Sequence, residues 1–287
     1  MSNQDKFKDI AKKVEGGERL SYKEIMTLLD LAHKALEKQS NLLKLKPPLV
    51  MVGDTHGDFE TSLKVFERYK HKKLFIGDYV DRGEHQLENI NFLLVKLIKG
   101  EAWLLRGNHE SMPINYTYGF SDVLIREYSS YWMDLFVRYN EVFSLMPYAA
   151  KVKKFLVLHG GLPKGLRKVK EIGKLPRKDM IPRDERGFQL LWNDPNEEVE
   201  EFSPNLVRGD GVLYFGAKAL RRFLRDNGLK GLIRAHEPKE RGYAFTFKDE
   251  KGGLNGHLLL TVFSCRYYGI SPAVALYDGK SIKVENL

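Results

Sequence analysis

Residues that can bind metal ions or carry protons gather in five short clusters of the sequence. The clusters read GDTHGD, GDYVDRG, RGNHE, HGG and RAHE, and they begin at residues 53, 77, 106, 159 and 234. They contain six candidate metal ligands: Asp54, His56, Asp78, Asn108, His159 and His236. This set offers imidazole nitrogens and carboxylate or amide oxygens but no thiolate. Such ligands suit manganese, iron or zinc better than copper(I) or an iron–sulfur cluster.

The number of candidate ligands points to two ions rather than one. Six ligands are more than a single tetrahedral ion needs. If one carboxylate bridges, the set fits two divalent ions about 3.5–4 Å apart. Such a pair can polarise a phosphoryl group and lower the pKa of a water molecule held between the ions. The protein then needs no nucleophilic side chain of its own.

Other phosphate-handling and hydrolytic chemistries lack their motifs in this chain. There is no G-x-x-x-x-G-K-[ST] phosphate loop, no G-x-G-x-x-G after a strand, and no H-E-x-x-H. A cysteine phosphatase needs an arginine six residues after its nucleophile, and here Ser271 stands six residues after Cys265. A cysteine-based mechanism is therefore excluded.

Composition describes a globular chain with a basic surface. The 287 residues are 43% hydrophobic and 30% charged, which allows a large core under a solvated surface. Lys and Arg exceed Asp and Glu by 47 − 38 = 9, which favours acidic partners such as phosphoproteins, nucleotides or nucleic acid. The basic stretch 164–178 contains no aromatic residue to stack on bases, so no nucleic-acid partner is expected.

Cysteine usage and apolar runs bear on the cellular location. The single cysteine, Cys265, excludes an internal disulfide scaffold and fits a reducing compartment. No apolar run approaches the roughly 18 residues that a membrane helix needs. The first twenty residues have no apolar h-region, so they do not read as a signal peptide. We expect a cytoplasmic protein without a membrane partner.

Short apolar runs rich in Val, Ile, Leu and Phe precede the polar clusters. The runs cover residues 49–52, 74–76, 102–105, 155–158, 231–233 and 258–263. Such runs are typical of strands buried on both faces, and polar residues past their ends meet at one edge of a sheet. Helical patterns lie between them at 61–69, 85–98, 122–139 and 216–227. This alternation predicts an α/β fold and by itself also allows a doubly wound sheet.

Short sequence motifs predict the local structure near both ends of the chain. Ser21 and Glu24 have the spacing of a helix capping box, followed by the apolar helical face of Ile25, Leu28, Leu29, Ala32, Ala35 and Leu36. Pro47-Pro48 ends this segment. We predict an N-terminal helical segment over 1–47 packed on a catalytic domain over 48–287, forming one compact unit. Asp278-Gly279 predicts a two-residue hairpin turn between strands at 273–277 and 281–284.

The five clusters, in this order and with this spacing, resemble the PPP serine/threonine phosphoprotein phosphatases, within the binuclear metallophosphoesterases. Weaker support comes from LWNDP at 191–195, FG at 215–216 and FS at 263–264. The helix leading into LLKL at 42–45 is also similar to the approach to this family's first motif, so the resemblance covers roughly residues 20 to 270. It implies a two-sheet β-sandwich flanked by helices, the calcineurin-like metallophosphoesterase fold.

The resemblance also implies an activity, cofactors and partners. The activity is hydrolysis of phosphoserine and phosphothreonine in proteins by direct attack of a metal-bridging hydroxide. The cofactors are two divalent ions, Mn²⁺ first, with iron or zinc as alternatives. The partners are phosphoprotein substrates, and regulatory subunits are compatible with the family.

Metal-binding roles follow from the motif positions. Asp54 and His56 would bind the first ion. Asp78 would bridge both ions, since its carboxylate can bind one through each oxygen. The second ion would be bound by Asn108, His159 and His236.

Catalytic and substrate-binding roles follow in the same way. His109 would be the general acid that protonates the leaving oxygen, and Asp81 would orient its ring and raise its basicity. Phosphate oxygens would be bound by the two arginines, Arg82 and Arg208, and by Asn108, with Tyr268 lining the site.

The sequence departs from the family pattern in two places. Residues 264–269 read SCRYYG where eukaryotic members resemble Ser-Ala-Pro-Asn-Tyr-Cys, and one extra residue separates Arg208 from the FG pair.

Two alternative functions are considered for the chain. A phosphodiesterase or dinucleoside polyphosphate hydrolase could use the same metal core, although Glu110 and the LLWNDP stretch favour the protein phosphatases. A phosphopeptide-binding scaffold without activity would require a lost ligand or acid, and none is lost.

Overall fold

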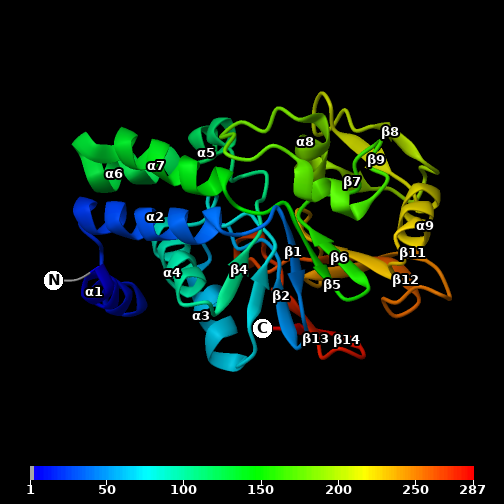
Figure 1. Cartoon of the computed structure of the whole chain (residues 1–287), viewed down its shortest axis with the longest axis horizontal. Helices are drawn as coiled ribbons and strands as arrows, with labels where there is room; N and C mark the ends of the chain where they lie inside the picture. Colours follow the sequence, from blue (N-terminus) through cyan, green and yellow to red (C-terminus); the bar gives the residue numbers. More distant parts are fainter. Residues whose placement is uncertain (1–2) are drawn as a thin grey trace.

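Two β-sheets face each other at the centre of the computed structural model, which describes residues 3–287 (Figure 1). The five-stranded sheet has the order β14-β13-β2-β3-β4 and the six-stranded sheet the order β1-β5-β6-β10-β12-β11. The strands of the first are β2 (Leu49–Val52), β3 (Lys73–Phe75), β4 (Ala102–Leu104), β13 (Ala273–Tyr277) and β14 (Ile282–Asn286). Those of the second are β1 (Leu42–Leu45), β5 (Ala149–Val152), β6 (Phe155–Leu158), β10 (Gly231–Arg234), β11 (Tyr243–Lys248) and β12 (His257–Val262).

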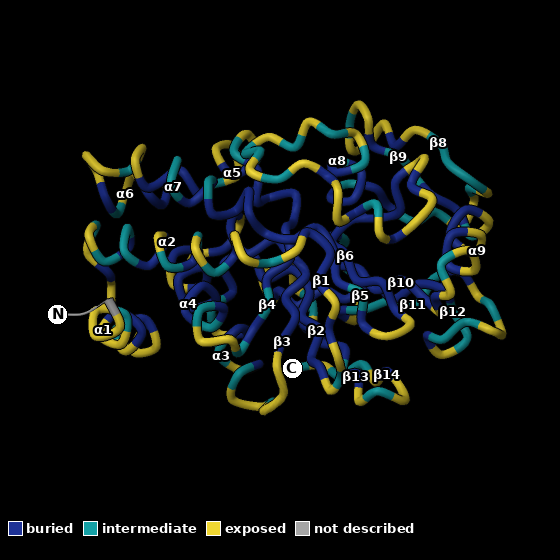
Figure 2. Tube along the Cα trace, viewed as in Figure 1, coloured by how far each residue is buried: buried dark blue, intermediate teal, exposed yellow. Residues whose placement is uncertain are grey.

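Alternating side chains along each strand separate the core into layers. In β2, Val50 and Val52 pack among the helices, while Leu49 and Met51 point into the space between the sheets. In β6, Val157 points into the same inner layer and Leu156 into the opposite outer layer. Each central strand is therefore buried on both faces, as its uninterrupted apolar run predicts (Figure 2).

Helices cover both outer faces, so the predicted two-sheet sandwich flanked by helices is confirmed. On the side of the five-stranded sheet, one apolar core joins it to α1 (Asn3–Glu15), α2 (Tyr22–Glu37), α3 (Phe59–Arg68), α4 (Gln86–Ile98), α6 (Phe120–Tyr128) and α7 (Trp132–Ser144). Helix α4 contacts β4, α1 and α2 pack on α4, α7 packs on α2, and α6 packs on α7. On the six-stranded sheet lie α8 (Glu185–Trp192), α9 (Ala217–Asp226) and the 3₁₀ segment η2 (Val169–Lys174). The short helix α5 (Met112–Thr117) follows the third polar cluster, and η3 (Arg266–Tyr268) follows β12.

A third, small sheet lies beside α8 and α9 (Figure 1). It is formed by β7 (Asp194–Pro195), β9 (Leu213–Phe215) and β8 (Phe202–Pro204), in that order. The turn between β8 and β9 carries Arg208.

The N-terminal segment is helical as predicted except at its end. Both halves of the Ser21–Glu24 capping box form at the start of α2. Residues 42–45, however, form β1, which pairs in parallel with β5 in the six-stranded sheet. The segment thus supplies a strand to the core as well as helices that pack on it. The division at residues 47 and 48 remains a prediction.

Two further expectations about local structure are wrong. The predicted helix 122–139 is divided by the 3₁₀ turn η1 (Ser129–Tyr131), where Ser129 has a positive φ of 43°. The hairpin loop covers four residues, since Tyr277 pairs with Ile282. Asp278 lengthens the turn because its carboxylate accepts hydrogen bonds from the backbone N–H groups of Lys280 and Ser281.

Parallel strands deliver the polar clusters to one region. Strands β2, β3 and β4 run parallel, as do β6, β10 and β12. Asp54, Asp78, Asn108, His159 and His236 each follow one of these strands within a few residues. The predicted convergence of strand ends is therefore confirmed. Among residues 3–287, no helix has both the length and the apolar character needed to cross a bilayer.

Candidate metal centre

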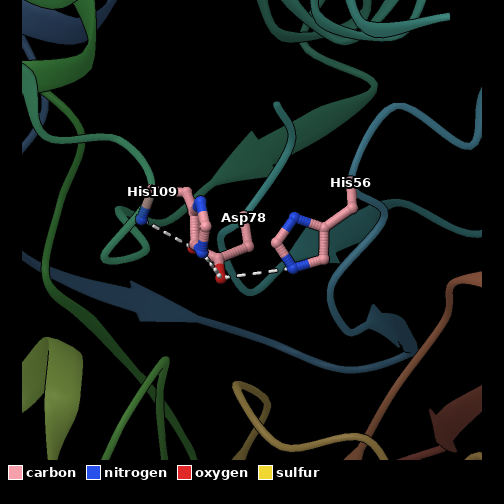
Figure 3. Close-up of side chains that lie close together, drawn as sticks. All are labelled: His56, Asp78 and His109. Carbon is pink, nitrogen blue, oxygen red and sulfur yellow. Dashed lines mark hydrogen bonds and ion pairs between the residues drawn. The ribbon is translucent and has the colours of Figure 1, made fainter. Parts of the chain in front are cut away.

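Two groups of buried side chains could each hold a metal ion, and they share one carboxylate. His56, Asp78 and His109 form the first group, and Asp78, His159 and His236 form the second. Within each group the potential ligand atoms lie within 4.8 Å of one another. His56 and His109 lie on either side of the Asp78 carboxylate (Figure 3). A carboxylate shared by two ligand groups has the arrangement that a bridging ligand requires.

Distances place the ligand atoms around Asp78. Its Oδ2 lies 3.6 Å from His56 Nε2, and its Oδ1 lies 3.3 Å from His159 Nε2. His159 Nε2 also lies 2.8 Å from Asn108 Oδ1 and 3.2 Å from His236 Nδ1. Asp54 joins the cluster from β2, since its Oδ1 accepts the backbone N–H of His236 at 2.9 Å. The six predicted ligands are therefore brought together.

Hydrogen bonds on the far side of two rings fix which nitrogen faces the cluster. His56 Nδ1 lies 3.0 Å from the Val80 carbonyl, and His159 Nδ1 lies 2.9 Å from the Ile76 carbonyl. A carbonyl only accepts hydrogen bonds, so in each ring Nδ1 carries the proton and Nε2 of the neutral ring carries the lone pair. Carbonyls orient metal-binding histidines in this way.

Unpartnered polar atoms in the cluster fit a cation. Asp54 Oδ2 and His236 Nε2 are buried and have no hydrogen-bond partner among the described residues. Each such atom costs free energy in a protein interior unless something pairs with it. His159 Nε2 also lies 2.8 Å from Asn108 Oδ1 and 3.3 Å from Asp78 Oδ1, so three potential ligand atoms meet at this point. Divalent ions would satisfy all of these atoms, so the donor set fits the metals expected of it.

Burial and neighbouring charges shift the pKa values of the side chains in the cluster. Burial raises the pKa of Asp54 to about 7. Burial also lowers the pKa of His56 to about 3 and the pKa of His236 well below its ordinary value, so both rings are neutral. At Asp78 burial opposes ionisation, but His159, His109 and His56 together outweigh it and hold the pKa of that carboxyl well below its usual range. Burial opposes protonation of His159 as well, but Asp78 and Asp54 outweigh it and raise the pKa of that ring. Neutral imidazoles beside carboxylates are the forms that bind metal.

His109 sits at the edge of the cluster and is held by Asp81. Its Nδ1 donates to Asp81 Oδ2 at 2.6 Å, and Asp81 Oδ1 accepts the backbone N–H of Phe120 at 3.0 Å. Burial opposes protonation of the ring, but Asp78 and Asp81 outweigh it and raise the pKa of His109. The second nitrogen, Nε2, faces the cluster at 3.9 Å from Asp78 Oδ2. The ring can therefore present a proton on Nε2 beside the metal-ligand groups.

Backbone strain is concentrated at the strand-end loops. Five non-glycine residues there have positive φ: His56 at 42°, Asp78 at 59°, Asp81 at 69°, Arg82 at 71° and His236 at 70°. Such conformations cost roughly 1–3 kcal/mol each and persist only where surrounding bonds enforce them. Here the loops bond to each other, since the Asp78 carbonyl accepts the N–H groups of Thr55 and His56.

Two glycines allow the loops after β3 and β4 to touch. A Cβ on Gly107 would lie 2.2 Å from Asp78 Oδ1, and a Cβ on Gly77 would lie 2.6 Å from the Cα of Gly107. Gly77 also has φ of 107°, a conformation that other residues rarely adopt. Any side chain at either position would push Asp78 away from its neighbours.

The predicted phosphate-binding residues surround the ligand groups. The Arg82 guanidinium lies 4.3 Å from the ring centre of Tyr118, whose ring lies 5.4 Å from that of His109. The ring of Tyr268 lies 5.9 Å from that of His56. Arg208 Nε donates to Asp194 Oδ2 at 2.9 Å, and Asp194 Oδ1 lies 3.8 Å from His236 Nε2.

Glu110 is a buried site residue to which sequence reasoning gave no role. Its carboxylate accepts the backbone N–H groups of Asp78, Tyr79 and Gly107 at 2.7, 2.8 and 2.9 Å. It thus joins the loops after β3 and β4. Its place directly after His109 was the only local signal.

Asp58 and Asp194 are the other anchors that the sequence did not reveal. Asp58 caps α3 and binds Arg266, so it ties the loop that carries Tyr268 to the loop that carries His56. Asp194 binds both Arg208 and Arg234. Its position in LLWNDP marked it as part of a motif without indicating these partners.

Comparison with known proteins identifies the family. The calcineurin-like phosphoesterase family matches residues 47–240, well over half of the chain. The catalytic subunit A1 of serine/threonine-protein phosphatase 2B from Saccharomyces cerevisiae is 34% identical over 270 residues, which cover 87% of this chain and 48% of that protein. The serine/threonine-protein phosphatase BSL2 from Arabidopsis thaliana is 34% identical over 271 residues, covering 87% of this chain and 25% of that protein. The chain therefore spans less than half the length of these curated relatives.

Solved structures share the fold. A protein serine/threonine phosphatase from Saccharomyces cerevisiae with similarity to human phosphatase PP5 superposes with a TM-score of 0.83 at 28% identity, covering 100% of this chain and 96% of that one. A cold-active protein-tyrosine phosphatase from a psychrophilic Shewanella species superposes with a TM-score of 0.62 at 16% identity, over 88% of this chain and 84% of that one, and shows the fold alone. The fold, the clustered ligands and the sequence match agree, and the chain belongs to the calcineurin-like phosphoesterase family.

Proposed function

We propose that this chain hydrolyses phosphoserine and phosphothreonine monoesters in proteins with two divalent metal ions. The observation that carries the proposal is the Asp78 carboxylate shared between two buried ligand groups. Support comes from the relatives named as serine/threonine protein phosphatases and from the PP5-like structure that matches over the whole chain. Mn²⁺ is the proposed native ion, with iron or zinc as alternatives, and the proposed location is the cytoplasm.

In this proposal six side chains divide the ions between them. Asp54 and His56 would hold the first ion, Asp78 would contribute to both sites, and Asn108, His159 and His236 would hold the second ion. When bound, the ions would neutralise charge on the phosphoryl oxygens and activate the attacking water. The Asn108 amide can give its oxygen to an ion and its NH₂ group to a phosphate oxygen.

His109 supplies the proton that the leaving serine or threonine oxygen needs. Its Nδ1–H is engaged by Asp81, so Nε2–H is the proton available on the cluster side. The neighbouring carboxylates raise the pKa of this ring, which favours its protonated form. Asp81 is the positioning residue, because it fixes the ring through Nδ1.

Two arginines bind the substrate phosphate. Arg208 donates to Asp194 through Nε, and among residues 3–287 no side-chain hydrogen bond engages its terminal nitrogens, which can make charge-assisted bonds to phosphate oxygens. Arg82, in the loop after β3, lies over the ring of Tyr118. Tyr268 lines the remaining side. Phosphoproteins are the partners that this arrangement serves, and regulatory subunits are compatible with the family.

Phosphate release from a phosphothreonine peptide tests the proposal. The protein is stripped with a chelator and Mn²⁺, Fe²⁺ or Zn²⁺ is added back, with a phosphotyrosine peptide, a phosphodiester and a dinucleoside polyphosphate run in parallel. Turnover restored by Mn²⁺ with preference for phosphothreonine is the expected result. Preference for the diester or nucleotide would overturn the substrate assignment and keep the metal centre. Absence of turnover with every ion would favour a phosphopeptide-binding scaffold.

A further inference from the structure

The turn between β8 and β9 holds two large aliphatic side chains out in solvent. Leu206 is 80% exposed and Val207 is 90% exposed, more than any other large hydrophobic residue in the described part of the chain. Isolated exposed apolar residues are common on protein surfaces. These two are adjacent, however, and they directly precede Arg208.

Hydrogen bonds give this turn a fixed shape. The Asn205 carbonyl accepts the N–H groups of Arg208 and Gly209 at 3.1 and 3.2 Å. The buried Asn205 side chain donates to Asp194 Oδ2 at 3.1 Å, and the same oxygen accepts Arg208 Nε at 2.9 Å. Both ends of the Leu206–Val207 pair are therefore fastened to one buried carboxylate.

Two routes connect the turn to the metal-ligand cluster. In the first, Asp194 Oδ1 accepts Arg234 Nη2 at 2.9 Å and lies 3.8 Å from His236 Nε2. The second is aromatic: the Trp192 ring meets the His236 ring edge-on at 5.7 Å and stacks on Phe188 at 5.9 Å. Phe188 in turn lies against Gly211 of the turn, where a Cβ would be 3.5 Å from its ring. The turn that carries the aliphatic pair is thus connected to the cluster through Asp194 and through the Trp192–Phe188 stack.

We infer that Leu206 and Val207 form a contact surface, called here the 206–207 surface, for an aliphatic side chain next to the phosphorylated residue of a protein substrate. The inference rests on the proposed function, because Arg208 would hold the phosphate. Consecutive Cα atoms are about 3.8 Å apart, so the backbone of Leu206 and Val207 lies within two residues' reach of the arginine that would hold the phosphate.

The size of the surface favours a substrate segment over a second copy of the chain. A stable dimer buries about 800 Å² on each partner, which two side chains cannot supply. A segment already anchored by its phosphate needs only a small additional contact. Aliphatic side chains gain from this contact by leaving water, whereas polar ones do not.

A peptide pair with one difference tests the inference. Two phosphothreonine peptides carry either leucine or serine at both positions flanking the phosphothreonine and are otherwise identical. The metal-loaded wild-type protein is expected to favour the leucine peptide in kcat/KM by about tenfold. In L206S/V207S that ratio should fall to within about twofold of one. The control I125S removes an exposed aliphatic side chain from α6, at the opposite end of the molecule (Figure 1), and should keep the wild-type ratio.

The ratio of the two peptides within one variant is unaffected by partial loss of active protein. A wild-type ratio near one, or an unchanged ratio in L206S/V207S, would overturn the inference while leaving the proposed function intact. Hydrolysis of p-nitrophenyl phosphate without hydrolysis of either peptide by the wild type would instead contradict the proposed function and the inference with it.

Discussion

The Asp58–Arg266 pair tests whether long-range anchors hold the site loops together. Arg266 donates through Nε and Nη2 to Asp58, at distances between 2.8 and 3.1 Å, across 208 residues of sequence. Asp58 is fully buried and also caps α3, while the Arg266 side chain is 43% exposed. Breaking the pair should destabilise the fold and loosen the loop that carries Tyr268.

The expected magnitude follows from the geometry. Charge-assisted hydrogen bonds contribute about 1.5–3 kcal/mol. The exposed guanidinium is partly screened by water, which reduces the coupling between the two side chains to about 1–2 kcal/mol. Asp58→Asn removes the charge and keeps one oxygen that can accept the Thr61 N–H, but its NH₂ group replaces the oxygen that accepts Thr61 Oγ1–H and the Arg266 backbone N–H. These losses occur with either residue at position 266, so they cancel in a double-mutant cycle.

Urea unfolding of D58N, R266M and D58N/R266M gives the coupling as a double-mutant cycle. The Arg222–Glu201 pair is the matched control, because it is also bidentate, with distances of 2.8 and 2.6 Å, but both partners are more exposed. We expect a clearly larger coupling for Asp58–Arg266. Equal couplings, or a value near zero for Asp58–Arg266, would refute the reasoning from burial.

Three other substitutions probe separate parts of the account. His109→Gln should leave the metal content unchanged and lower kcat on phosphothreonine peptides by about 10²–10⁴. The loss on p-nitrophenyl phosphate should be smaller, because its leaving group needs little protonation. Loss of an ion from this variant would show that His109 is a metal ligand instead. Arg208→Lys should raise KM for the peptides, because lysine cannot make a bidentate contact, and an unchanged KM would remove Arg208 from the phosphate site. Glu24→Gln should destabilise the fold. Hydrogen bonds from Lys13 and Ser21 outweigh the effect of burial and lower the pKa of Glu24 from 4.5 to about 2. The ionised Glu24 therefore stabilises the fold fully above about pH 4.5, and this stabilisation disappears as the pH falls through 2. Unfolding curves across that range would show a pH-independent difference if the assignment is wrong.

The sequence predicts the metal-ligand residues because their signal is local. Each ligand stands within a few residues of an apolar strand, and parallel strands bring such positions to one edge. The same locality explains the capping box of Ser21 and Glu24. These features need no knowledge of distant contacts, so they could be read from spacing alone.

What the sequence did not predict depends on contacts between distant segments. Residues 42–45 look like the end of a helical segment, and only pairing with β5 makes them a strand. Arg266 donates hydrogen bonds to Asp58, which lies 208 residues earlier in the chain, and Asp194 accepts hydrogen bonds from Arg208 and Arg234. No spacing rule specifies such partners.

Local conflicts account for the two wrong details. Apolar spacing continues through 122–139, yet the backbone breaks at Ser129 with a positive φ. The Asp278-Gly279 pair favours a two-residue turn, but the Asp278 carboxylate bonds two N–H groups further on and lengthens it. In both cases a specific backbone conformation overrode a pattern based on residue type.

Metal stoichiometry of the wild type and of Asp78→Asn tests the central claim most directly. Both proteins are loaded with Mn²⁺, desalted and measured by elemental analysis, with phosphothreonine-peptide turnover recorded on the same samples. We expect two ions per wild-type chain, loss of both in D78N, and loss of nearly all turnover. D78N that retains two ions and wild-type turnover would contradict the shared role of Asp78, and so would a wild type that binds a single ion.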